Sequence, residues 1–80
     1  MVMGPVSEVA GSVHAAIIAE RYPGRLLLTV SQVGPLIGRS RAQVHRMAAE
    51  GKLPFIIVGT RRMVPVGALI QWLEDNEREA

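Results

Sequence analysis

The sequence predicts a small α+β domain in which two short helices precede a β-hairpin and a closing helix. Two capping sequences, each followed by a short apolar pattern of helical period, flank a glycine turn near residue 38. A β-rich run over residues 54–58 is followed by a second glycine turn and a returning strand. At 80 residues, the chain is long enough for one domain with a modest core.

The N-terminal extension, residues 1–25, is expected to hold one helix over residues 7–21 with Ser7 as its N-cap. Apolar residues recur there at helical spacing, at Val9, Val13 and Ile17. The run Tyr22-Pro23-Gly24 ends the helix, because proline lacks an N–H donor and glycine tolerates the reversal. Two placements remain open: the helix packs within the domain, which we favour, or on a neighbouring molecule.

A short strand and a first helix are expected next. Leu26-Leu27-Leu28 fits a buried strand, and Thr29 and Gln32 form a capping box that opens a helix over residues 30–37. Its buried residues are expected to be Val33, Leu36 and Ile37. Gly34-Pro35 is unfavourable there, because a proline ring clashes with the carbonyl four residues before it. The helix therefore either bends or starts nearer Ser31.

The second helix is expected over residues 41–50, after a tight turn at Gly38 and Arg39. Ser40 and Gln43 repeat the capping signature, and Gly51 ends the helix in a left-handed conformation. Its buried stripe is expected to be Val44, Met47 and Ala48. Two short helices joined by a glycine-containing turn form a helix-turn-helix, whose second helix can enter the major groove of DNA.

The hairpin completes a winged helix-turn-helix. The run over residues 54–58 turns at Gly59-Thr60-Arg61 and returns over residues 62–64. Pro65 then starts a last helix over residues 66–76, with an apolar face of Leu69, Trp72 and Leu73. We therefore expect an extension at 1–25, the winged helix-turn-helix domain at 26–76, and a frayed tail at 77–80.

Charge is unevenly distributed although the net charge is only +2. Residues 39–62 hold six basic residues against the single acid Glu50, whereas residues 74–79 hold four acids against Arg78. A basic centre beside an acidic end indicates a polyanionic partner for the centre.

The exposed face of the second helix is small, polar and basic, as a surface that enters a groove must be. Arg41 or Arg46 can reach a guanine edge with two hydrogen bonds, and Gln43 can address adenine. His45 can bond a base or a phosphate, and the start of the helix at Ser40 favours a phosphate oxygen. The expected recognition-helix residues are Arg39, Ser40, Arg41, Ala42, Gln43, His45 and Arg46.

The hairpin tip supplies a second expected contact, through Thr60, Arg61 and Arg62. A narrow minor groove has a strongly negative potential that attracts inserted arginine. The alternative is a polar turn that serves solubility alone. Thr29 and Lys52 are expected to touch phosphate.

Other chemistry finds no support in the sequence. Cysteine is absent, His14 and His45 lie too far apart in sequence to suggest a metal pair, and there is no phosphate-binding glycine loop or catalytic triad. We therefore expect no enzyme activity, cofactor, metal or small-molecule substrate. No apolar run approaches the ~20 residues that cross a bilayer, and the N-terminus lacks a secretory pattern, so we expect a cytoplasmic protein without a membrane partner.

An ordered series of residues resembles the excisionase-type winged-helix domain, which is related to the MerR DNA-binding domain. The resemblance covers about residues 26–75 and rests on Leu28-Thr29-Val30, Leu36-Ile37-Gly38, Ser40-Arg41, Val44, Arg46, Glu50-Gly51-Lys52-Leu53-Pro54, Gly59, Arg61-Arg62, Val64-Pro65 and Trp72-Leu73. It implies that the helix opening at Ser40 is the recognition helix and that the wing at Gly59–Arg62 lies along the minor groove.

The resemblance also implies a role. Excisionases are recombination directionality factors of bacteria, phages and mobile elements. They bind direct repeats in attachment-site DNA, often cooperatively with neighbouring copies, and bend the DNA so that a tyrosine integrase can excise the prophage. They catalyse nothing themselves. A nucleoid-associated protein in a bacterial cytoplasm is therefore expected.

The chain departs from the family pattern at three places. Gly34-Pro35 stands where helix-favouring residues are usual, and Arg39 replaces a small apolar residue. The run Phe55-Ile56-Ile57-Val58 is more apolar than a typical wing strand. Either this run is buried on both sides, under the helices and the strand at 26–28, or it is partly exposed and helps neighbouring protomers to pack along DNA.

Two rival functions remain. The first is a small MerR-like transcriptional regulator, which acts at a promoter, usually as a dimer on inverted half-sites. A chain of 80 residues favours the excisionase, because such regulators usually need an effector domain or a long dimerising helix. The second rival is a protein-interaction adapter, which has little salt-dependent affinity for DNA.

Overall fold

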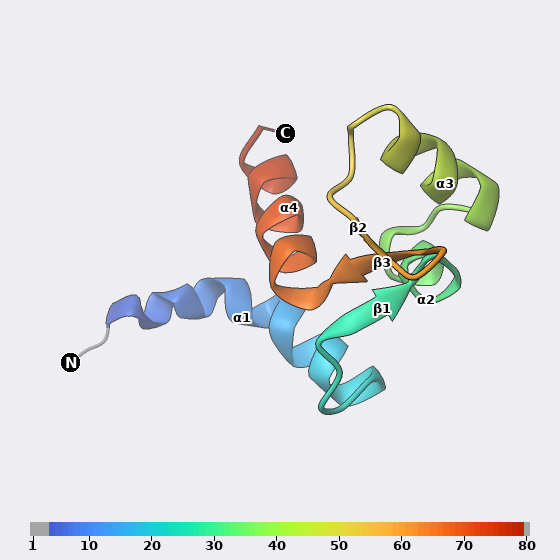
Figure 1. Cartoon of the computed structure of the whole chain (residues 1–80). Coiled ribbons are helices and arrows are strands. Elements are labelled where there is room, and N and C mark those ends of the chain that lie inside the picture. The colour runs from blue at the N-terminus through green and yellow to red at the C-terminus, as the bar shows by residue number, and fades with distance from the viewer. Residues whose placement is uncertain (1–3, 80) are drawn as a thin grey trace.

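The computed structural model describes residues 4–79, which form four helices and a three-stranded antiparallel sheet (Figure 1). The elements in chain order are α1 (Gly4–Arg21), β1 (Leu27–Thr29), α2 (Val30–Ile37), α3 (Arg41–Ala49), β2 (Ile56–Val58), β3 (Arg61–Pro65) and α4 (Val66–Glu79). The strand order β1-β3-β2 places β3 at the centre. The α2–α3 pair followed by the β2–β3 hairpin confirms the predicted α+β winged helix-turn-helix. Within residues 4–79, no helix has both the length and the apolar character needed to span a bilayer.

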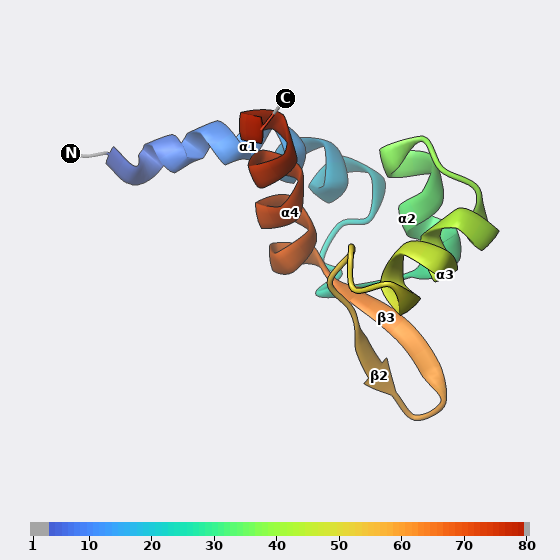
Figure 2. The ribbon, with the colours of Figure 1, turned by 90° about the horizontal axis from the view of Figure 1, so that it is seen from above.

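Helix α1 packs within the chain, against α4. Ile18 is buried in the core, Tyr22 packs beside it, and His14 Nε2 lies 3.1 Å from Glu77 Oε2 on α4. The first part of α1 extends away from the body (Figures 1 and 2). Of the two open placements, packing within the domain is therefore the one observed for the second half of this helix.

The expected start of α1 is wrong, and the apolar residues at helical spacing do not mark the face that is buried. The helix begins at Gly4, so Ser7 lies inside the helix and not at its cap. Val13 and Ile17 are 64% and 48% exposed, and the side chain of Val9 lies outside the described residues. Ile18 takes the inward position near the end of α1. Ile17 then lies about 100° from Ile18 around the helix axis, and Val13 shares the outward side with Ile17.

Both predicted capping boxes are confirmed. The backbone N–H of Gln32 donates to Thr29 Oγ1 at 3.2 Å, and Gln32 Oε1 accepts from the Thr29 N–H at 2.9 Å. The same pair of bonds joins Ser40 and Gln43, at 3.1 and 2.9 Å. Each box satisfies backbone donors that the first turn of a helix leaves free, so α2 and α3 start where the sequence places them.

Helix α2 continues through Pro35, and the residue before it, Gly34, lies against the turn that leads to α3. The carbonyl of Gly34 accepts hydrogen bonds from the backbone N–H groups of Gly38 and Arg39, which folds the turn tightly against the helix. A Cβ at Gly34 would lie only 2.6 Å from the carbonyl oxygen of Arg39. Glycine at residue 34 is therefore what allows the α2–α3 turn to approach this closely.

Replacing Gly34 with alanine is expected to destabilise the domain by about 1–3 kcal/mol, because the turn must move away from the new methyl group. Alanine favours a helix by about 1 kcal/mol over glycine, which offsets part of this loss, so the net destabilisation should lie in the lower part of the range. The control is Gly67→Ala in α4, where an added Cβ meets nothing within 4 Å. Urea denaturation should show a lower midpoint for Gly34→Ala and an unchanged or higher one for Gly67→Ala; two unchanged midpoints would contradict the packing.

The hairpin is a continuation of the core sheet. Leu28 on β1 pairs with Val64 on β3, and further along β3 Arg62 and Arg61 pair with Ile57 and Val58 on β2. The turn is Gly59-Thr60, with Gly59 at φ 65°, so Arg61 belongs to the strand and not to the turn.

Two expectations about burial are corrected. Leu26 is 83% exposed and precedes β1, so the buried strand starts one residue later than expected. Strand β2 pairs only with β3, and its residues Ile56, Ile57 and Val58 are 44%, 57% and 47% exposed. Because β2 is an edge strand beyond the helices, its apolar side chains are not buried on both sides.

Helix α4 closes the core and fixes the end of α3. Among the side chains that the structure describes, those without measurable exposure are Leu28, Val33, Val44 and Leu69, one from each of β1, α2, α3 and α4. The Trp72 indole donates a 2.7 Å hydrogen bond to the carbonyl of Lys52, in the loop after α3. The helix reaches Glu79, three residues beyond the expected end, so residues 77–79 are helical; Ala80 lies outside the described residues.

Candidate nucleic-acid interface

A cleft of about 440 Å³ separates α3 from the hairpin. Figure 2 shows the hairpin projecting from the body on the side where α3 lies. The cleft is lined by Thr29, Val30 and Ser31 at the start of α2, Arg41 and His45 on α3, and Ile57, Thr60, Arg61 and Arg62 on the hairpin. The predicted recognition helix and the predicted wing therefore face one common space.

The cleft is strongly basic. Three arginines and a histidine line it, and none of the lining residues is acidic. Three hydroxyl groups and the positive end of the α2 dipole add hydrogen-bond donors and partial positive charge. Arginine forks and helix N-termini both bind phosphate oxygens, so this arrangement suits a nucleic-acid backbone.

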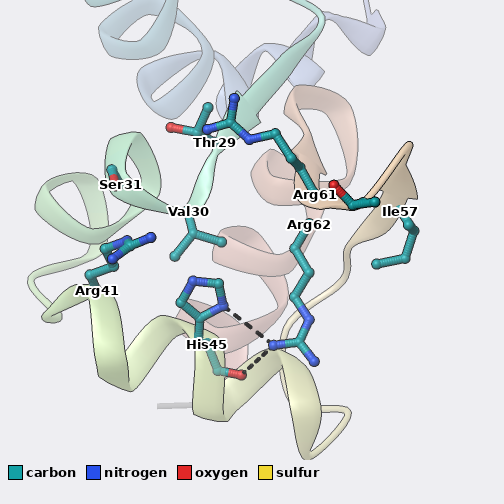
Figure 3. A pocket seen from close by; sticks show the side chains of 9 residues that line it. Thr29, Val30, Ser31, Arg41, His45, Ile57, Arg61 and Arg62 are labelled. Atoms are coloured by element: carbon teal, nitrogen blue, oxygen red, sulfur yellow. Dashed lines mark hydrogen bonds between the residues drawn. The ribbon is translucent and has the colours of Figure 1, made fainter.

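The two wing arginines have different surroundings (Figure 3). Arg62 is half-buried and turns toward α3, where its Nη1 lies 3.3 Å from His45 Nδ1 and 3.3 Å from the His45 carbonyl oxygen. Its guanidinium carbon also lies 5.2 Å from the centroid of the Phe55 ring, a cation–π contact. Arg61 is exposed and extends toward the Thr29 side of the cleft. Arg61 is thus available to a ligand, while Arg62 joins the hairpin to α3.

The outward face of α3 carries Ala42, Arg46 and Ala49, all exposed. Helical geometry places these three residues opposite the buried Val44 and Ala48. Two small side chains around one arginine leave room for close approach to a groove floor, as the sequence indicated. His45 instead is half-buried and faces the cleft.

A second, shallower hollow of about 290 Å³ lies on the other flank of α3. It is lined by Arg39, Gln43, Arg46, Met47, Glu50 and Lys52. Lys52 Nζ lies 3.4 Å from Glu50 Oε1, which offsets part of its charge. The carboxamide oxygen of Gln43 is engaged in the capping box, so a bidentate contact to adenine requires breaking that cap.

The structure thus divides the predicted site residues between the two flanks of α3. Thr29, Arg41, His45, Thr60, Arg61 and Arg62 share the cleft, whereas Arg39, Gln43, Arg46 and Lys52 share the second hollow. Ser40 is a cap at the start of α3, and Ala42 lies on the outward face. Sequence reasoning missed Val30, Ser31 and Ile57 as lining residues. The capping box at Thr29 was a usable signal for Ser31, because it marks a helix N-terminus; nothing local indicated Ile57.

One comparison with known proteins agrees with this architecture. No curated protein and no solved structure matches the chain. A family model described as a helix-turn-helix domain, a DNA-binding family, matches residues 27–77, from the start of β1 into α4. This match covers more than half of the sequence and includes α2, α3 and the hairpin, so the chain belongs to the helix-turn-helix domain family.

Proposed function

We propose that this chain binds double-stranded DNA, with α3 in the major groove and the β2–β3 hairpin over the adjacent minor groove. The observation that carries the proposal is the basic cleft shared by α3 and the hairpin. Adjacent grooves of a duplex are separated by one phosphate backbone. Two elements that occupy adjacent grooves must therefore straddle that backbone, and the space between them must accept phosphate.

The cleft meets that requirement in both shape and charge. Arg41 on one wall and Arg61 on the other are exposed and can each donate to a phosphate oxygen. Such contacts position the protein, whereas base edges specify the sequence. We assign base reading to the outward face of α3, where Arg46 can address guanine with two hydrogen bonds.

We further propose that the chain acts as an excisionase-type recombination directionality factor. It would bind direct repeats in attachment-site DNA, bend that DNA through neighbouring copies, and direct a tyrosine integrase toward excision. The ordered residue resemblance over about residues 26–75 supports this role. The exposed apolar strand β2 supports the contact between neighbouring copies.

DNA retardation at varied salt tests the proposal. If about four to six phosphates are neutralised, log K should fall with log salt with a slope of roughly −4 to −5. A slope near zero would favour the adapter and reject DNA binding. Duplexes with direct repeats should bind with higher cooperativity than duplexes with inverted repeats; the opposite preference would favour a MerR-like regulator.

The β2 contact is tested by Ile56→Lys. Ile56 pairs with Met63 near the base of the hairpin and is 44% exposed, so lysine should leave folding intact. We expect cooperativity on tandem sites to be lost while affinity for a single site changes little. Val13→Lys on α1 is the matched control, because it places the same side chain at an exposed apolar position away from the hairpin. Unchanged cooperativity in a folded Ile56→Lys variant would reject the contact.

A further inference from the structure

We propose that Arg62 holds neutral His45 in the tautomer that carries its proton on Nε2, and that this N–H donates to a DNA phosphate oxygen in the cleft. The second half of this inference rests on the DNA-binding function proposed above. The first half concerns the free protein and stands on the contacts of Arg62 alone.

The tautomer follows from donor and acceptor roles. A guanidinium group has only N–H donors, so whatever it bonds must accept. Arg62 Nη1 lies 3.3 Å from His45 Nδ1, and therefore Nδ1 must offer its lone pair. A neutral imidazole with an accepting Nδ1 carries its proton on Nε2.

Arg62 is held in place by contacts that do not involve a ligand. The same Nη1 also lies 3.3 Å from the carbonyl oxygen of His45, and the guanidinium lies over the Phe55 ring. These three contacts join β3, α3 and the segment before β2. The hydrogen bond to Nδ1 is therefore in place before DNA arrives, so the His45 side chain loses little conformational entropy on binding.

The Nε2 edge of His45 faces the cleft on the Arg41 side (Figure 3). Within residues 4–79, no hydrogen bond to His45 Nε2 is found. The charged groups around the ring are Arg41 on its own helix and Arg61 and Arg62 on β3, while α2 contributes only uncharged residues. Three cations and no acid favour a phosphate oxygen as the acceptor over an uncharged base edge.

The tautomer is measured in the free protein by long-range ¹⁵N–¹H correlation of the imidazole, at a pH where the ring is neutral. We expect Nε2 to be protonated and Nδ1 to be unprotonated. Arg62→Met should release the ring to fast exchange between the two tautomers, which moves the two imidazole ¹⁵N shifts toward each other. Arg61→Met is the control, because it removes the same charge from the next residue without touching His45. A dominant Nδ1–H form, or an Arg62→Met spectrum equal to wild type, overturns the inference. Should Arg62→Met fail to fold, the wild-type spectrum decides, because partly averaged ¹⁵N shifts at the two ring nitrogens would contradict a fixed tautomer.

The donor role is measured by DNA affinity. Glutamine places its amide N–H near the position of Nε2, and asparagine near Nδ1. We expect His45→Asn to bind roughly tenfold more weakly, as for one lost hydrogen bond, and His45→Gln to bind nearly as well as wild type. One methylphosphonate in the duplex should remove the difference between these two variants.

The outcomes separate the two claims. The acceptor is a base edge, and the phosphate assignment is wrong, if the difference in DNA affinity between the asparagine and glutamine variants disappears when bases are changed but persists with a methylphosphonate. If wild type itself binds no duplex, DNA binding as a function fails, while the tautomer is still decided by the free-protein spectrum.

Discussion

Replacing Arg41 and Arg61 together with alanine is expected to weaken binding to any duplex by roughly 100-fold. Two exposed charge-assisted hydrogen bonds to phosphate are lost, which together contribute about 2–3 kcal/mol. These residues stand on opposite walls of the cleft. In the proposed binding mode their loss therefore releases the phosphate backbone that lies between them. The salt slope should also become shallower by about 1.8, because each phosphate contact contributes about 0.9.

The measurement is DNA retardation across a salt series, and its control is Arg21→Ala. Arg21 ends α1 and does not line the cleft, so its loss removes one positive charge without a phosphate contact. Arg46→Ala provides the contrast, since it should relax base preference with little change in binding to random sequence. Equal effects of Arg21→Ala and of each cleft arginine would mean that net charge alone determines binding, and the cleft would lose its assigned role.

Replacing Leu69 with alanine is expected to lower the free energy of unfolding by about 2–5 kcal/mol. Leu69 has no exposed surface and lies in the core cluster, where α4 covers the sheet and the helix-turn-helix. A domain of this size has a total stability of only about 4–12 kcal/mol. The single substitution therefore removes a large share of that stability, and a measurable fraction of the molecules should be unfolded at 37 °C.

Urea denaturation followed by the fluorescence of Trp72 measures this loss. The control is the same substitution at Leu26, which is 83% exposed. Leu26→Ala should change stability by no more than about 0.5 kcal/mol. If Leu26→Ala lowered the free energy of unfolding as much as Leu69→Ala, Leu26 would have to be buried in solution. That result would contradict its exposure in the structure.

The helix-turn-helix could be predicted from the sequence because the residues that determine its helix ends are close together in the chain. Ser40 and Gln43 are three residues apart, so the two bonds between them involve no distant part of the chain. Gly38 and Gly51 adopt the left-handed conformation that follows each helix. The fold class and the boundaries of α2 and α3 were therefore accessible from the sequence.

Long-range contacts were not accessible in the same way. The helical spacing of Val13 and Ile17 does not identify the buried face of α1, because tertiary packing selects Ile18 as the residue that enters the core. The bond between Arg62 and His45 joins residues 17 apart, and no local pattern marks it. Both arginines of the tip looked equivalent in sequence, and only the register of β3 turns one toward α3.

The central position of β3 has a mechanical consequence. This strand is bonded to β1 and β2, runs directly into α4, and is pinned to α3 through Arg62. These connections to the core fix the distance between α3 and the hairpin. If α3 and the hairpin occupy adjacent grooves as proposed, the protein is stiffer than the bound duplex, and the path of the DNA must adjust to it. Sequences with easily deformed pyrimidine–purine steps will fit at lower cost, even at base pairs that no side chain touches.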